Sequence, residues 1–277
     1  MQAYSRAVKK TAVFLAIFSF SGLFPGYARA VAVVEIFASQ SACDVSSKFQ
    51  DFKTATASSS EVIAPPEKSA SSSETREGKE DPALAARKTL TLQILECARR
   101  DVGRLLSAVG DIPLAGASAK DLQINILTRL ERAGEKITRI EKRIEETETV
   151  ETAKEIARDI ADWRKNEYLA LVENAGVFVV WGNGEILLDK AESRILQVRQ
   201  TLKSLKLHDA IEVQRAFEQA KTHSLRAEEN HLKAKQGIER FGKSDDVLKY
   251  VNASLDDLRN LYASLLRLSE VVAQAVK

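Results

Sequence analysis

The sequence predicts an all-α protein: an antiparallel helical bundle of long, coiled-coil-like helices, preceded by a disordered spacer. Glycine and proline, which destabilise helix interiors, number only 12 and 5 among the 277 residues. Apolar residues recur at spacings of three and four through most of the chain from residue 82 onward, which is the period of one helix face. The polar breaks between these periodic segments are short, as expected between antiparallel neighbours.

The N-terminal 30 residues have the three parts of a cleavable signal peptide. Basic residues come first, an uncharged apolar run follows over 11–24, and the small-residue site Ala28-Arg29-Ala30 closes the segment. The apolar run is shorter than the roughly 20 residues needed to span a bilayer. The alternative is an uncleaved N-terminal anchor, and only then do we expect membrane contact. We therefore expect export across the cytoplasmic membrane, to the periplasm, the cell surface or the medium.

The charge pattern argues against a nucleic-acid partner. Residues 1–30 hold four basic and no acidic side chains, so the rest of the chain carries 37 basic and 39 acidic residues. The two signs are interspersed along the sequence, whereas nucleic-acid binding needs a clustered basic face.

Two further segments precede the helices. Residues 31–52 form a short mature N-terminal segment, and the serine- and proline-rich residues 53–81 are predicted to be a disordered linker, because they cannot bury enough apolar area to offset chain entropy. The two cysteines are Cys43 and, on the first expected helix, Cys97. In an oxidising compartment they can form a disulfide. The alternative is that Cys97 is simply buried and Cys43 does not pair.

The first three expected helices lie between 82 and 174. Asp81-Pro82 suits an N-cap followed by proline at the first helical position, and Gly110 ends the first helix. Ser118 is the expected N-cap of the second helix, and the polar residues 145–149 form the turn before the third. Their apolar seams are Leu95, Ala98, Val102, Leu105 and Val109; Ile126, Leu130, Ala133, Ile137, Ile140 and Ile144; and Val150, Ala153, Ile156, Ile160, Trp163 and Leu171.

The last three helices have the most regular seams. Gly242 suits the C′ position after the fifth helix, and Ser244 suits the N-cap of the sixth. A period near 3.5 residues indicates side chains that interlock along nearly parallel axes. The seams are Leu188, Ala191, Ile195, Val198, Leu202 and Leu205; Val213, Phe217, Ala220, Ser224, Ala227, His231, Ala234, Ile238 and Phe241; and Leu248, Val251, Leu255, Leu258, Tyr262, Leu265, Ser269, Val272 and Val276.

The apolar, β-branched stretch 175–181 (AGVFVVW) interrupts this pattern and is closed by Gly182-Asn183-Gly184. Its propensity is that of a strand, but no other segment alternates with period two. We therefore expect a buried helix end or hydrophobic corner, with the helical region 82–277 forming one core or two subregions, 82–181 and 185–277. Because aromatic side chains at a corner are hard to cover, we predict an exposed interaction patch. Its residues are Val177, Phe178, Val180 and Trp181.

Part of the chain resembles a known group. The pieces that carry the resemblance are 130–146 (LERAGEKITRIEKRIEE), 186–206 (ILLDKAESRILQVRQTLKSLK) and 241–273, where the turn GKSDD opens a leucine-rich last helix. Over about residues 127–277 the chain is similar to uncharacterised exported all-helical proteins from bacteria with very small genomes. The resemblance implies an envelope or extracellular location and no known activity.

The sequence carries no constellation typical of catalysis. The histidines are His208, His223 and His231, and Glu228-x-x-His231 has the spacing that di-iron bundles use on one helix. Those sites need a second such pair, and the sequence has none. We therefore expect no catalytic residues, no cofactor and no metal ligands, with His231 acting as a polar residue of the helix seam.

These observations lead to three hypotheses of function. The first is a non-enzymatic exported scaffold or protein-interaction module, which binds a protein partner or a second copy of itself. The second is an ATP-independent periplasmic chaperone that holds unfolded chains. The third is a metal-binding helical bundle built around His231.

Overall fold

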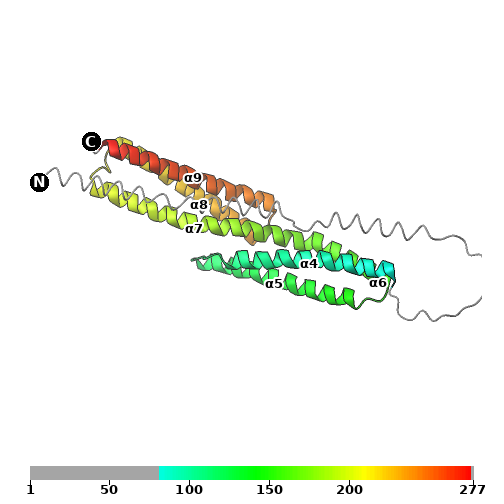
Figure 1. Cartoon of the computed structure of the whole chain (residues 1–277). Helices are drawn as coiled ribbons and strands as arrows, with labels where there is room; N and C mark the ends of the chain where they lie inside the picture. The colour runs from blue at the N-terminus through cyan, green and yellow to red at the C-terminus, as the bar shows by residue number, and fades with distance from the viewer. Residues whose placement is uncertain (1–80, 276–277) are drawn as a thin grey trace, which may run out of the picture. The chain divides into compact units, whose positions relative to one another are not determined.

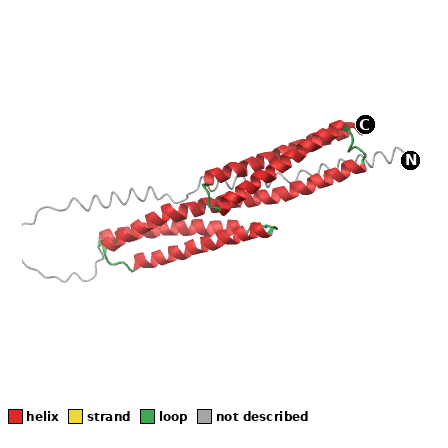
Figure 2. Cartoon of the chain, turned by 180° about the vertical axis from the view of Figure 1, so that it is seen from behind, coloured by secondary structure: helices red, strands yellow, loops and turns green. Residues whose placement is uncertain are grey.

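The computed structural model describes residues 81–275, which form helices with short connections and no strand among them (Figures 1 and 2). This confirms the expected all-α fold. The signal peptide 1–30, the segment 31–52 with Cys43, and the linker up to residue 80 lie outside the described residues, so the predictions made for them stay predictions. The elements are α4 (Pro82–Gly110), α5 (Ala117–Glu145), α6 (Val150–Trp163), the π-helical turn η2 (Arg164–Tyr168), α7 (Leu169–Ser204), α8 (Ile211–Glu239) and α9 (Ser244–Ala275).

The described residues fall into two compact units. The N-terminal unit comprises residues 82–107 and 125–172, and the C-terminal unit comprises residues 108–124 and 173–275. The predicted subregions 82–181 and 185–277 do not coincide with these units. The difference arises because the connection between α4 and α5 packs with the C-terminal helices, and because α7 has no break near residue 182.

In the N-terminal unit, α4, α5 and α6 alternate in direction. The expected N-cap of α4 is confirmed, since the Ala83 backbone N–H donates to Asp81 Oδ1 at 2.9 Å. Salt bridges join neighbouring helices on their solvent side: Arg99 with Glu141, Arg143 with Asp159 and Lys136 with Glu167. The later residue of α5, Arg143, pairs with the earlier residue of the next segment, Asp159, as antiparallel packing requires. The buried seams contain Leu95, Val102, Leu105, Ile126, Leu130, Ile137, Ile144, Ile156 and Ile160.

The third helix departs from the expected regular helix at η2. Its seam runs through Ile160 and Trp163 and then reaches Tyr168, five residues later, where Leu171 was expected. A π-helical turn accommodates one extra residue, so Trp163 and Tyr168 stay on one face with ring centroids 5.0 Å apart. The Tyr168 hydroxyl then donates to the Ala98 carbonyl oxygen at 3.2 Å. Spacing alone could not locate this extra residue.

In the C-terminal unit, α7 continues through the segment where the sequence predicts a helix end. The expected corner at 182–184 is wrong, because both glycines lie inside the helix. A Cβ on Gly182 would lie 3.0 Å from two methyl carbons of Ile112, and one on Gly184 would lie 3.4 Å from His231 Cε1. The glycines therefore serve close packing, which here overrides their low helix propensity.

The helices α7, α8 and α9 are antiparallel, and α8 and α9 lie side by side in both views (Figures 1 and 2). The expected α8 seam is confirmed from Val213 to Ile238, where every predicted residue is buried. On α9, Leu248, Tyr262 and Ser269 are only half-buried. Neighbouring positions replace them in the core: Val247, Ser254, Leu261 and Leu268.

Three predicted caps are wrong. The C′ position after α8, expected to be Gly242, is occupied by Phe241, which has the left-handed φ of 50°. Gly242 follows one residue later, and its N–H donates to the Gly237 carbonyl oxygen at 2.9 Å. The Ser244 hydroxyl donates to Glu173 at 2.8 Å. Ser118 lies inside the first turn of α5 and its hydroxyl accepts from Lys235. The hydroxyls of Ser244 and Ser118, which the local sequence predicts as helix caps, thus hydrogen-bond to residues far away in the chain.

Candidate functional site

The predicted interaction patch lies in the interior of the C-terminal unit. Val177, Phe178, Val180 and Trp181 belong to the middle of α7 and are 0–4% exposed. The expectation of an exposed patch is therefore wrong. Residues 177–182 are all buried, and a helix that is apolar on every side is an interior helix.

Trp181 is instead part of a buried aromatic and polar cluster between α7 and α8. Its indole stacks on the His231 imidazole, with ring centroids 4.8 Å apart and planes at 18°, and its Nε1–H donates to the His231 carbonyl oxygen at 3.1 Å. His231 Nε2 lies 2.6 Å from Glu185 Oε2, one turn along α7 from Trp181. We call Trp181, Glu185 and His231 the core histidine cluster. It joins two helices by stacking, a hydrogen bond and a carboxylate contact.

The electrostatics of this cluster favour an ionised Glu185. The close contact with His231 Nε2 lowers the pKa of the Glu185 carboxyl, partial burial opposes that change, and the charge of Lys235 adds to the lowering. Lys235 in turn contacts Ser118 and Glu239, the latter at 3.3 Å. The Glu185 carboxylate thus lies between a buried imidazole and a half-buried ammonium group.

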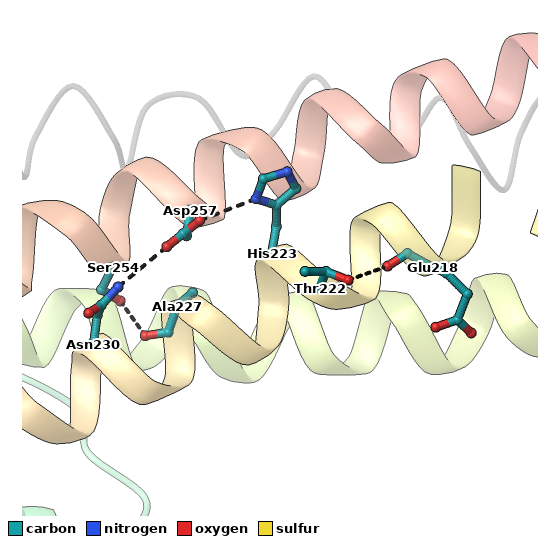
Figure 3. A network of polar contacts seen from close by, with 7 residues as sticks. All are labelled: Glu218, Thr222, His223, Ala227, Asn230, Ser254 and Asp257. Atoms are coloured by element: carbon teal, nitrogen blue, oxygen red, sulfur yellow. Dashed lines mark hydrogen bonds and ion pairs between the residues drawn. The ribbon is translucent and has the colours of Figure 1, made fainter. Parts of the chain in front are cut away.

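A second histidine–carboxylate pair joins α8 to α9 (Figure 3). His223 Nδ1 lies 3.2 Å from Asp257 Oδ1, and Asn230 Nδ2 donates to Asp257 Oδ2 at 3.3 Å. The nearby Ser254 hydroxyl donates to the Ala227 carbonyl oxygen at 2.8 Å. Both oxygens of Asp257 therefore have partners on α8, in a polar cluster at the edge of the apolar seam.

The two residues of the Glu228-x-x-His231 motif have different partners. Glu228 accepts from the Ser224 hydroxyl at 3.1 Å, whereas His231 pairs with Glu185 on another helix. Within residues 81–275 no group of three or more histidine, cysteine, aspartate or glutamate side chains could hold a metal ion.

In the N-terminal unit, a buried polar contact lies near η2. Asp101 and Tyr168 are hydrogen-bonded, and burial raises the pKa of both side chains. The charges of Arg104, Arg100 and Arg164 oppose the rise at Asp101. This arrangement fixes Tyr168 against α4.

The remaining predictions concern the cysteines and the membrane. Cys97 is half-buried on α4, and because Cys43 lies outside the described residues, their disulfide stays a prediction. None of the helices between residues 81 and 275 combines the length and apolarity needed to cross a bilayer.

Comparison with known proteins adds no assignment. No family model, no curated protein and no solved structure matches this chain.

The sequence singled out His231 and Trp181 but not their relationship. The sequence analysis did not single out Glu185 or Asp257, since nothing in their local spacing marks them as histidine partners. The one available signal was His231 on the apolar seam of α8, because a polar side chain on a buried seam needs a hydrogen-bonding partner.

Proposed function

We propose that this chain is an exported, non-enzymatic helical protein that acts by binding another protein. Export rests on the N-terminal sequence pattern. Binding rests on one surface of the C-terminal unit, the outer face of α8, where Leu225 and Leu232 are 56% and 54% exposed. Seven residues separate them, so they lie two helical turns apart on the same side.

Charged residues of both signs flank these leucines. Glu218 and Lys221 form an ion pair that precedes Leu225 in the chain. Glu229, between the two leucines, forms another with Lys233, which directly follows Leu232. An apolar centre with a polar rim of both signs is the usual anatomy of a protein–protein contact. We call Leu225, Leu232 and these two ion pairs the α8 surface, and it replaces the buried patch as the proposed contact.

The test is photo-crosslinking in the native host, with a crosslinking residue placed at Glu229 beside both leucines. We expect one or a few recurrent exported proteins to be captured, and the capture to be lost in Leu225→Glu/Leu232→Glu. The matched control is Leu169→Glu, since Leu169 is an exposed leucine of the N-terminal unit. Circular dichroism establishes that each variant is folded.

Other outcomes would redirect the proposal. Capture of a second copy of the chain, with a change of mass in sedimentation, would identify the partner as the protein itself. A broad set of unrelated exported proteins, increasing on heating, would favour the chaperone hypothesis. Equal capture by the leucine double variant and the wild type would overturn the α8 surface.

A further inference from the structure

We propose that α4 is the docking site for a segment of the same chain, residues 31–52, and that a disulfide between Cys43 and Cys97 locks this segment in place. The bond is a covalent modification that fastens the segment to the N-terminal unit. The inference rests on the proposed function only through export, which supplies an oxidising compartment.

The state of Cys97 is the first observation. Cys97 lies half-buried near the middle of α4. Among the described residues no cysteine is a free thiol, so the sulfur of Cys97 is already engaged. The full chain has two cysteines, and the other is Cys43. Within one chain Cys97 therefore has a single candidate partner, which belongs to the segment 31–52.

The surface of α4 beside Cys97 is apolar. Leu90 and Ile94 precede Cys97 by seven and three residues, which places the three side chains along one side of the helix. All three are half-buried and keep part of their surface exposed, whereas Leu95 on the core side of α4 is fully buried. We call Leu90, Ile94 and Cys97 the α4 stripe.

The residues that follow Cys43 have the chemistry to cover this stripe. Val45 and Phe49 are apolar, and packing them on Leu90 and Ile94 removes apolar surface from water on both sides. Ile94 and Leu90 lie about 4.5 and 10.5 Å from the helical cysteine along the helix axis. An extended chain advances about 3.3 Å per residue, so both side chains reach their turns of α4 while the two cysteines meet.

The length of the intervening chain allows this contact. Residues 44–80 separate Cys43 from the start of the described structure at Asp81. Cys97 follows Asp81 by 16 residues of helix, a distance of about 24 Å. A flexible chain as long as 44–80 has a mean end-to-end distance of roughly 30–36 Å. Cys43 therefore reaches Cys97 without stretching the linker.

Formation of the bond is a two-electron oxidation. The thiols of Cys43 and Cys97 lose two protons and two electrons as the S–S bond forms. A disulfide-bearing oxidant of the compartment takes up these electrons and protons by exchange and is reduced to two thiols.

Docking and mere tethering have different consequences for stability. If residues 31–52 lie on α4 in the folded protein, the bond removes freedom mainly from the unfolded chain and so stabilises the N-terminal unit. If the segment does not dock, the bond restricts the folded and the unfolded chain alike and leaves the stability unchanged. The comparison of oxidised and reduced protein therefore separates the two cases.

The first experiment maps the bond in the whole chain, recovered from the native host, with free thiols alkylated and the protein digested without reduction. We expect mass spectrometry to find one peptide pair that joins Cys43 to Cys97. Alkylation of both cysteines, in this protein and in purified protein treated with a glutathione redox pair, would overturn the proposal. A bond that forms only after purification would support the docking and count against export.

The second experiment measures thermal unfolding of the purified chain with and without a phosphine reductant. We expect reduction to lower the melting temperature by roughly 5–15 °C, the shift for opening a loop of this length in a domain of this size. The control Cys43→Ser/Cys97→Ser should not respond to the reductant. Equal melting temperatures of oxidised and reduced wild type would overturn the docking.

The third experiment tests the contact with the α4 stripe. Val45→Ser/Phe49→Ser changes no residue of α4, so a defect of the helix itself cannot explain its effect. We expect this variant to form the disulfide but to lose most of the difference between its oxidised and reduced melting temperatures. The matched control Ser47→Ala/Gln50→Ala should keep the difference. Equal differences in the two variants would overturn the α4 stripe as the docking site.

Discussion

The indole of Trp181 lies against the imidazole of His231, and the same indole donates its Nε1–H to the His231 backbone at 3.1 Å. Trp181 thus binds both the side chain and the main chain of α8 while it is only 1% exposed. We predict that Trp181→Ala lowers the free energy of unfolding by about 3–5 kcal/mol, through the cavity and the lost hydrogen bond. Urea denaturation measures this. The exposed control Leu266→Ala should change stability by less than about 0.5 kcal/mol, and equal stabilities for the two variants would contradict the placement of Trp181.

The glycines of the C-terminal unit provide a matched pair. Gly237 lies in α8, where a Cβ would come within 2.6 Å of Val247 Cγ2, whereas a Cβ on Gly176 of α7 would meet nothing within 4 Å. We predict that Gly176→Ala raises stability by about 0.5–1 kcal/mol, the helix-propensity difference. Gly237→Ala should lower it, because α8 and α9 must separate or Val247 must shift. Stabilisation by both substitutions in the same denaturation assay would contradict this close approach.

The turn between α7 and α8 contains a non-glycine residue in the left-handed region. Lys206 has φ 56°, and its N–H donates to the Lys203 carbonyl oxygen at 3.0 Å. Since this conformation costs an L-residue about 1–2 kcal/mol, Lys206→Gly should stabilise the protein by about 0.5–1 kcal/mol despite the extra freedom of glycine in the unfolded chain. Lys203→Gly, inside the last turn of α7, should instead destabilise it by about 1 kcal/mol. Thermal unfolding of the two variants tests the prediction that one raises and the other lowers the melting temperature.

The π-helical turn η2 behaves as a one-residue insertion. Deleting the exposed Asn166 would leave Trp163 and Tyr168 four residues apart, still on one face of a regular α-helix. We predict that this deletion variant folds with its helix content and stability retained. Deleting Arg158 in α6 should destabilise strongly, because it rotates Ala153 and Ile156 about 100° away from Ile160 and Trp163. Circular dichroism and urea denaturation distinguish the two deletion variants. Equal losses of stability in both would show that η2 does not tolerate the removal of one residue.

Acid should weaken the contact between α7 and α8 through Glu185. Its pKa is lowered in the fold, chiefly by the close contact with His231. A carboxyl with a lowered folded-state pKa adds stability above its unfolded value, near 4.3, and that stability is lost as the pH falls through the folded-state pKa. Denaturation at pH 6, 4.5 and 3 should therefore show a loss in the wild type that is smaller in Glu185→Gln. The exposed Glu192→Gln serves as control and should follow the wild type.

Much of the fold could be predicted from periodicity. The seam from Val213 to Ile238, the end of α4 at Gly110 and the start of α6 at Val150 follow from local spacing, turn composition and capping, because a helix buries every third or fourth residue whatever it packs against. The candidate site was harder to predict. The pairing of His231 with Glu185, and of His223 with Asp257, depends on which helices become neighbours and in what register.

The sequence by itself thus determined that residues 81–275 form long antiparallel helices, since propensity and apolar period act within one segment. Tertiary structure decided the rest. It kept Gly182 and Gly184 helical because Ile112 and His231 pack against them, it buried Trp181 in the core instead of exposing it, and it moved the seam to Tyr168 through a π-helical turn. In each case a contact between residues far apart in the chain outweighed a local preference of about 1 kcal/mol or less.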